Sequence, residues 1–193
     1  MASPLRLCLA STSRYRAELL GRLGLPFTQF APQVDETPLG DEAPQALAER
    51  LARQKAMTVA RAHAGVWVLG SDQAAAAGAE RLEKPGTLAR AKAQLQAMSG
   101  QRIHFFTAYT LCRDGECLNG IDVTTVQLRP LSAASIDRYL SLEPALDCAG
   151  SFKCEGLGIS LFDAIETRDP TALVGLPLIG VAALLRQVGF SVP

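Results

Sequence analysis

Apolar residues recur along the chain with two different spacings, which predict that strands alternate with helices. Short, mainly apolar stretches are typical of strands, and they occur over residues 5–10, 27–31, 66–69 and 159–165. Two longer runs flank Asp114 and Gly115, a pair that favours a tight hairpin, and they cover residues 103–112 and 121–128. Apolar residues spaced by three and four predict helices after residue 13 and over residues 41–63, 87–98, 132–140 and 177–188.

This order of elements predicts an α/β protein in which a mixed sheet packs against flanking helices. The chain has 193 residues, of which 48% are hydrophobic, and this suits one domain with room for two lobes around a cleft. We expect the strand at 66–69 to end where the apolar run meets Gly70, Ser71, Asp72 and Gln73.

The junction between the first strand and the first helix has the pattern of an anion site. Residues 11–13 read Ser-Thr-Ser, and either Ser11 or Ser13 can cap the helix, because a short side-chain oxygen accepts an N–H of the first turn. A helix start offers free N–H groups and a positive dipole end to a phosphate. Arg16 shares a helix face with leucines, so its guanidinium should point toward the sheet. The alternative is an ordinary capped helix with surface arginines.

Two carboxylates stand where open α/β sheets place ligands, at strand ends and in the adjacent loops. Glu36 lies in a loop bounded by prolines, and Asp72 follows an expected strand. Two hard oxygen donors beside a phosphate site suit Mg²⁺ or Mn²⁺. The alternatives are a solvated loop carboxylate for Glu36 and a turn-forming role for Asp72.

Two lysines can add positive charge to a phosphate site. Lys55 falls in the middle of the apolar face of the helix at 41–63, where an apolar residue is expected. Lys84 precedes Pro85, which favours an extended backbone and a projecting side chain. The alternatives are an ammonium that reaches solvent along the helix surface for Lys55, and an ordinary exposed loop lysine for Lys84.

Composition narrows the classes of partner. The formal net charge is +0, so no overall field favours nucleic acid or an anionic membrane. No apolar run approaches the roughly 20 residues that span a bilayer, and the first residues lack a signal-peptide pattern; we therefore expect a cytoplasmic protein. The five cysteines have no C-x-x-C spacing and do not fit a zinc site. We expect them to be reduced, partly buried small side chains.

The candidate residues also favour one kind of chemistry. The chain has no Gly-x-x-x-x-Gly-Lys loop, which argues against a P-loop NTPase. No serine or cysteine forms an evident nucleophile pair with either of the two histidines, His63 and His104. Direct attack by a metal-bound water therefore fits these residues better than covalent catalysis.

Nine short motifs stand in an order and spacing that is specific as a set. They are Leu9-Ala-Ser-Thr-Ser13 with Arg16, Val34-Asp-Glu36, Lys55-Ala56, Gly70-Ser-Asp-Gln73, Lys84-Pro85, Phe106-Thr107, Leu128-Arg129-x-Leu131-Ser132, Ala149-Gly150 and Val174-Gly-Leu-Pro177. Together they resemble the Maf family of nucleoside triphosphate pyrophosphatases along essentially the whole chain. The resemblance implies one domain over residues 1–193, with a fold like that of inosine triphosphate pyrophosphatases: an elongated mixed sheet and two lobes around a central cleft.

The same resemblance implies the reaction and the residues that perform it. The reaction is hydrolysis of a nucleoside triphosphate to the monophosphate and pyrophosphate, with a divalent cation, Mg²⁺ or Mn²⁺, as cofactor. Asp72 is implied as the proton acceptor, and Glu36 and Asp72 as the metal ligands. The remaining residues implied to contact the triphosphate are Lys55, Lys84, Ser11, Ser13 and Arg16.

Within the family, two motifs resemble the branch that acts on 7-methyl-GTP: Asp147-Cys-Ala-Gly-Ser-Phe-Lys-Cys-Glu-Gly156 and Ser71-Asp-Gln-Ala74. The carboxylate of Glu155 can accept both N–H groups on the guanine edge. Tyr15 can stack on the cationic methylated base, and Gln73 belongs to the motif of this branch. For Tyr15 a surface aromatic and for Glu155 a loop carboxylate remain the alternatives. Two alternative functions are open. One is the same reaction on dTTP or UTP, and the other is that of a nucleotide-binding regulatory module in cell-division control with little turnover.

Four positions depart from the family pattern. Tyr15 stands where this branch often has tryptophan. Ala17 stands where a second arginine is usual, and Arg14 is an extra arginine that either replaces the missing charge or is an ordinary exposed side chain. Glu83 stands where a glycine usually precedes Lys84. These departures bear on affinity and substrate preference more than on the reaction. The expected partner is a small nucleotide, with neither nucleic acid nor membrane; a homodimer is left open.

Overall fold

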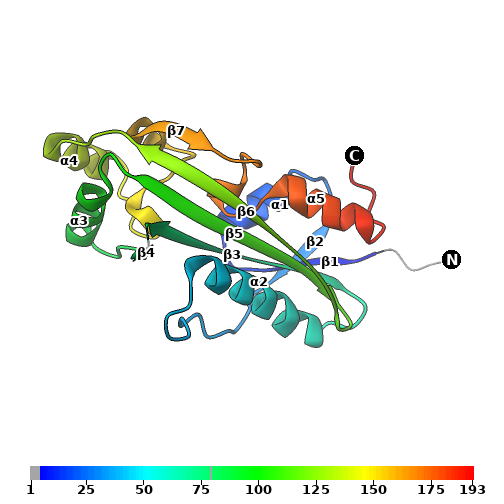
Figure 1. Cartoon of the computed structure of the whole chain (residues 1–193). Coiled ribbons are helices and arrows are strands. Elements are labelled where there is room, and N and C mark those ends of the chain that lie inside the picture. Colours follow the sequence, from blue (N-terminus) through cyan, green and yellow to red (C-terminus); the bar gives the residue numbers. More distant parts are fainter. Residues whose placement is uncertain (1–4, 79) are drawn as a thin grey trace. The chain divides into compact units, whose positions relative to one another are not determined.

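The computed structural model describes residues 5–78 and 80–193, and its strands form a mixed sheet with flanking helices (Figure 1). The α/β fold class expected from the sequence is confirmed. Strand β1 (Leu7–Ala10) pairs in parallel with both β2 (Phe27–Phe30) and β3 (Trp67–Ala77). The remaining strands are β4 (Glu80–Leu82), β5 (Arg102–Arg113), β6 (Glu116–Leu128) and β7 (Phe162–Glu166). The order across the sheet is β2-β1-β3-β5-β6-β7, with β4 antiparallel to β3.

Helices occur where the apolar spacing predicts them. They are α1 (Arg14–Gly21), α2 (Pro44–Arg61), α3 (Leu88–Met98), α4 (Ala133–Leu142) and α5 (Leu178–Gln187). Short 3₁₀ turns cover Ala149–Ser151, Leu157–Leu161 and Ala172–Val174. No helix in the described part of the chain is long and apolar enough to cross a membrane.

The chain divides into two compact units. The first comprises residues 5–73, 107–122 and 169–193, and the second comprises residues 74–106 and 123–168. The first unit therefore holds β1, β2, α1, α2 and α5, and the second holds α3, α4, β4 and β7. In the second unit α3 packs against α4, and the ring of Phe152 makes edge contacts with Phe105 and Phe162, with ring centres 5.6 and 4.7 Å apart.

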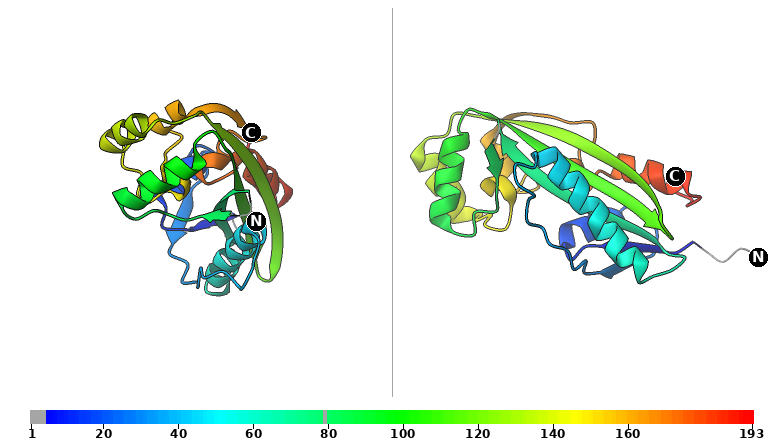
Figure 2. Two further views of the ribbon diagram at one scale, coloured as in Figure 1. Left: turned by 60° about the vertical axis from the view of Figure 1, so that its left-hand side comes forward. Right: turned by 60° about the horizontal axis from the view of Figure 1, so that its bottom comes forward.

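In the first unit, alternate residues of the parallel strands enter two separate cores. Leu7, Leu9 and Trp67 pack with the leucines of α1 and with α5. Cys8 and Val68, one residue along each strand, pack with residues of α2 on the other face. Figure 2 shows α2 in cyan, lying along the sheet. This alternation is the two-residue period of a strand. It also determines which face of the sheet each later side chain of β3 points to.

Strand β3 does not end at Gly70, so the expected strand end is wrong, and so is the alternative that Asp72 forms a turn. The strand runs on to Ala77, and Asp72 lies within it. Gly70 is needed for packing: a Cβ at this position would collide with the carbonyl oxygen of Ala52 and lie 2.6 Å from the amide nitrogen of Ala56. Because Gly70 has no side chain, α2 can approach the sheet closely. Glycine within a strand often marks such a close approach of another backbone.

The expectation that all five cysteines are reduced is also wrong. Cys112 and Cys117 form a disulfide across the β5–β6 hairpin, with their Cα atoms 4.2 Å apart. The two-residue turn at Asp114 and Gly115 permits this bond, because it sets residues 112 and 117 opposite each other on neighbouring strands. Cys8, Cys148 and Cys154 are free.

Smaller differences concern element ends. Strand β6 begins at Glu116, five residues before the expected start, because it continues directly from the hairpin turn. The strand expected over 159–165 is instead β7 at Phe162–Glu166, preceded by the 3₁₀ turn Leu157–Leu161. Helix α1 begins as expected, with the side chain of Ser13 as its N-cap.

Candidate active site

Lys55 joins two of the predicted carboxylates in the first unit. Its Nζ lies 2.6 Å from Glu36 Oε1 and 2.6 Å from Asp72 Oδ1. Lys55 and Asp72 are buried, at 5% and 8% exposure, whereas the side chain of Glu36 is 60% exposed. The sequence prediction that these three residues belong to one site is consistent with this arrangement, which is called the Glu36–Lys55–Asp72 cluster below.

The fold explains why these side chains meet. Lys55 lies on the buried face of α2, between Ala52 and Ala56, where the helix touches Gly70. Asp72 is two residues beyond Gly70 on β3, so its side chain points to the same face of the sheet. The close approach permitted by Gly70 therefore brings the ammonium and the carboxylate together.

The loop that carries Glu36 is fastened to α2 by contacts that the sequence analysis missed. Arg50 donates to both carboxylate oxygens of Glu42 at 2.7 Å and to the carbonyl oxygen of Thr37 at 3.0 Å. Asp35 Oδ1 accepts the amide of Thr37 at 2.9 Å, and hydrogen bonds from Thr37 lower the pKa of Asp35. Only the spacing of Glu42 and Arg50 could have signalled this in the sequence, and spacing of eight residues across a helix start is a weak signal.

Arg16 points inward, as its place on the leucine face predicts. Ser13 Oγ accepts its amide at 3.4 Å, and its Nε donates to the carbonyl oxygen of Gly175 at 3.0 Å. Burial lowers the pKa of Arg16, while the negative charges of Asp72 and Glu36 partly oppose that effect. The guanidinium therefore lies within electrostatic reach of the Glu36–Lys55–Asp72 cluster.

A turn near the C-terminus orients Arg16. Ser71 Oγ lies 3.1 Å from the same carbonyl oxygen of Gly175 and 2.8 Å from that of Ala108. Gly175 has φ of 121°, which disfavours any other residue. No local pattern could reveal the contacts to Gly175, because it lies 159 residues from Arg16 and 104 residues from Ser71 in the chain.

Gln73 also makes hydrogen bonds to the segment that leads into this turn. Its Nε2 lies 2.9 Å from Thr107 Oγ1, 3.0 Å from the carbonyl oxygen of Ala172 and 3.2 Å from that of Leu173. Since side chains alternate along β3, Gln73 lies on the face opposite to Asp72. Its role in substrate specificity stays a prediction, and its amide N–H groups already have protein partners.

Two other predicted residues at the start of α1 have local partners. Ser11 is buried, and its Oγ accepts the amide of Ser13 at 3.1 Å. Tyr15 OH accepts a hydrogen bond from Arg14 Nη2 at 3.0 Å, and the Arg14 guanidinium lies 4.8 Å from the centre of the tyrosine ring. Ala17 packs against the core of the first unit.

Lys84 and Glu155 both belong to the second unit and are exposed. Cys154 Sγ lies 3.4 Å from Glu155 Oε2. Their predicted contacts with substrate stay predictions.

Comparison with known proteins assigns the chain to a family. Residues 6–188 match the family model described as Maf-like protein. The chain belongs to the Maf family. This agrees with the resemblance inferred from the nine motifs, and the matched residues span the Glu36–Lys55–Asp72 cluster, Arg16 and the turn at Gly175.

Maf-family relatives match over nearly the full length. The chain is 60% identical over 188 residues to the 7-methyl-GTP pyrophosphatase of Xanthomonas oryzae pv. oryzae (strain MAFF 311018), covering 97% of this chain and 99% of the relative. It is 50% identical over 187 residues to the 7-methyl-GTP pyrophosphatase of Bordetella avium (strain 197N), covering 96% and 94%. The Ham1 protein of Staphylococcus aureus, a solved structure, has a TM-score of 0.47 and 12% identity, covering 64% of this chain and 71% of that one. That likeness is too weak to carry an argument.

The donor set of this Maf-family chain fits a hard divalent cation. Glu36 and Asp72 offer carboxylate oxygens next to one another, held by the same ammonium. Mg²⁺ is commonly bound by one or two carboxylates, with water and substrate phosphates as the other ligands. The described residues contain no group of three or more His, Cys, Asp or Glu side chains that could hold a metal by themselves. A two-carboxylate site completed by phosphate is therefore the arrangement that these residues suit.

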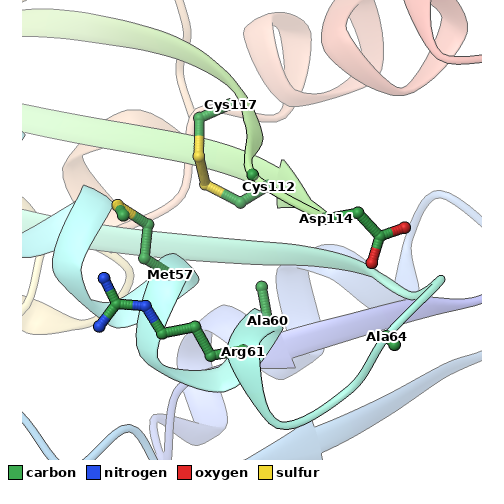
Figure 3. A pocket seen from close by; sticks show the side chains of 8 residues that line it. Met57, Ala60, Arg61, Ala64, Cys112, Asp114 and Cys117 are labelled. Carbon is green, nitrogen blue, oxygen red and sulfur yellow. A yellow bond between two sulfur atoms is a disulfide. The ribbon is translucent and has the colours of Figure 1, made fainter.

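A pocket of about 240 Å³ lies elsewhere in the first unit, between the end of α2 and the β5–β6 hairpin (Figure 3). The Cys112–Cys117 disulfide forms part of its wall, and Met57, Arg61 and Asp114 also line it. None of its lining residues is among the predicted site residues, so the pocket adds nothing to the proposed chemistry.

Proposed function

We propose that this Maf-family chain hydrolyses 7-methyl-GTP to the nucleoside monophosphate and pyrophosphate. The observation that carries the proposal is the Glu36–Lys55–Asp72 cluster, whose two carboxylates act electrostatically on the inward-pointing Arg16. The full-length relatives named 7-methyl-GTP pyrophosphatase support the choice of substrate. The proposed enzyme is a hydrolase that acts on a phosphoric anhydride.

Charge explains how this cluster suits a triphosphate. Two carboxylates and one ammonium leave a net negative charge, which a divalent cation can offset before the anionic substrate arrives. Glu36 and Asp72 would hold Mg²⁺ or Mn²⁺, and the cation would neutralise phosphate charge and make its bound water a better nucleophile. Arg16, with the free N–H groups at the start of α1, would bind the phosphate oxygens.

Asp72 is the proposed proton acceptor. Its carboxylate would take a proton from the attacking water as the bond between the α and β phosphates breaks and pyrophosphate leaves. Lys55 keeps Asp72 and Glu36 in place and adds positive charge as charge develops on the departing oxygens. Lys84 is proposed as a further phosphate contact, and Tyr15 and Glu155 as contacts of the base.

A substrate panel tests the proposal. Purified wild-type protein is given 7-methyl-GTP, GTP, dTTP and UTP in turn, and pyrophosphate release is measured with Mg²⁺ and with Mn²⁺. We expect the highest kcat/KM for 7-methyl-GTP, loss of activity with EDTA, and recovery when either cation is restored. Preference for dTTP or UTP would contradict the substrate, and saturable binding without pyrophosphate release would contradict the enzyme.

A further inference from the structure

In the second unit, the last turn of α4 holds the segment from Lys153 to Gly158, which carries Glu155. Glu143, the residue that follows α4, accepts the amide of Leu157 at 3.2 Å on Oε1 and the amide of Gly158 at 3.0 Å on Oε2. A buried or half-buried carboxylate that accepts backbone amides makes strong, charge-assisted hydrogen bonds. The segment is therefore anchored at its C-terminal end by one side chain.

Tyr139 anchors the other end of the segment. Its hydroxyl donates to Glu143 Oε2 at 3.1 Å and accepts the amide of Lys153 at 3.2 Å. Tyr139 is 3% exposed, and burial raises its pKa, so the hydroxyl keeps the proton that it donates to Glu143. One hydrogen-bonded chain thus runs from Lys153 through Tyr139 and Glu143 to Gly158.

Two glycines allow the segment from Lys153 to Gly158 to pack closely against Glu143 and against its own backbone. A Cβ at Gly156 would collide with Glu143 Oε1, and a Cβ at Gly158 would collide with the carbonyl oxygen of Lys153. A side chain at Gly156 would therefore displace the Glu143 carboxylate, and a side chain at Gly158 would strike the backbone of Lys153. This gives the Glu-Gly-x-Gly sequence at 155–158 a structural reason that does not involve any ligand.

The one acidic side chain of the segment remains exposed. The Glu155 side chain is exposed, with Oε2 3.4 Å from the Sγ of the neighbouring Cys154, while Lys153 Nζ lies 3.5 Å from Asp147 Oδ1. A carboxylate that accepts hydrogen bonds from two adjacent N–H groups of a base binds it more tightly when the carboxylate is already held in place. Less conformational entropy is then lost on binding.

We propose that Tyr139 and Glu143 are positioning residues for base specificity: they fix the segment at 153–158 so that Glu155 is presented to a purine base with adjacent N–H donors. This inference rests on the proposed function. It assigns to Tyr139 and Glu143 no contact with substrate, and it predicts that their loss weakens recognition of the base without changing the hydrolytic step.

The test compares Glu143→Gln, Tyr139→Phe and Glu155→Gln with wild type on 7-methyl-GTP and on UTP. In Glu143→Gln the new amide group sets an N–H donor against a backbone N–H, so one anchor is lost. For each variant we expect KM for 7-methyl-GTP to rise about tenfold, with kcat within about twofold and kcat/KM for UTP unchanged. The double variant of Glu143→Gln and Glu155→Gln should lose no more than either single variant, because both remove the same interaction.

Asp137→Asn is the matched control on the same helix, since Asp137 forms an exposed ion pair with Lys92; it should leave both substrates unaffected. Equal losses on 7-methyl-GTP and UTP, or additive losses in the double variant, would overturn the positioning role while the proposed function stands. A wild type that does not prefer 7-methyl-GTP to UTP would overturn the proposed substrate, and the inference with it.

Discussion

Lys55 is the residue on which the candidate site is built. A buried ammonium is costly unless it is paired, and here two carboxylates pair with it. The sequence marked Lys55 as unusual because it interrupts the apolar face of α2. It left open an ammonium that reaches solvent, and burial of the side chain removes that alternative.

Replacing Lys55 tests this role. In Lys55→Met the two carboxylates lose their shared cation and a positive charge near the phosphates disappears. We expect kcat for 7-methyl-GTP to fall by about 10²–10³-fold, the size typical for one preorganised charge at a reacting centre. Lys92→Met is the control, because it removes an exposed lysine that pairs with Asp137. Equal activity of the two variants would contradict the role of Lys55.

At the scale of residues, contacts between side chains far apart in the chain could not be predicted from the sequence. The inward direction of Arg16 was predictable, because it shares a helix face with leucines. Its partner Gly175 was not, because the two residues are 159 positions apart. The same holds for Gln73, whose amide proves to be occupied by the carbonyl oxygens of Ala172 and Leu173.

At the scale of elements, the packing of α2 on β3 sets the position of the Glu36–Lys55–Asp72 cluster. Apolar spacing predicted helix α2 and the start of β3, but it predicted the wrong end for β3. Glycine has two uses, a turn and a close approach, and sequence alone did not distinguish them at Gly70. The answer depends on the backbone of α2, which meets β3 only in the folded chain.

Gly70→Ala tests this packing. The added methyl group would meet backbone atoms of Ala52 and Ala56, which have no room to yield. We expect the free energy of unfolding to fall by about 1–3 kcal/mol, with loss of activity as Lys55 and Asp72 move apart. Gly21→Ala is the control, because a Cβ at Gly21 in α1 meets nothing within 4 Å and should be neutral or stabilising. Urea unfolding of both variants measures the difference, and a Gly70→Ala protein as stable as Gly21→Ala would refute it.

At the scale of the whole molecule, the alternation of strands and helices predicted the fold class, and most element ends were close. The hairpin was predicted from Asp114 and Gly115, yet the disulfide that follows from it was not. The prediction of reduced cysteines used only their spacing in the sequence. It did not use the register of the hairpin, which sets Cys112 opposite Cys117. The predicted site residues also fall into two units, with Lys84 and Glu155 in the second.

Stability should fall in alkaline solution. Burial raises the pKa of the Cys148 and Cys154 thiols from 9.0 to about 12. The unfolded chain therefore releases these protons at lower pH than the folded chain, so their contribution to stability is complete below about pH 9 and is lost toward about pH 12. Urea unfolding across this range should show a steeper decline for wild type than for the double variant Cys148→Ala and Cys154→Ala. Parallel declines would contradict the prediction.

The most direct test of the proposed function is pyrophosphate release from 7-methyl-GTP by Asp72→Asn, with Asp137→Asn as the control. Asparagine keeps the shape of Asp72 but removes its charge and its ability to take a proton. We expect kcat to fall by about 10²–10⁴-fold in Asp72→Asn, the usual contribution of a general base, and to remain at the wild-type value in Asp137→Asn. A wild-type rate in Asp72→Asn would contradict the proposed role of the Glu36–Lys55–Asp72 cluster.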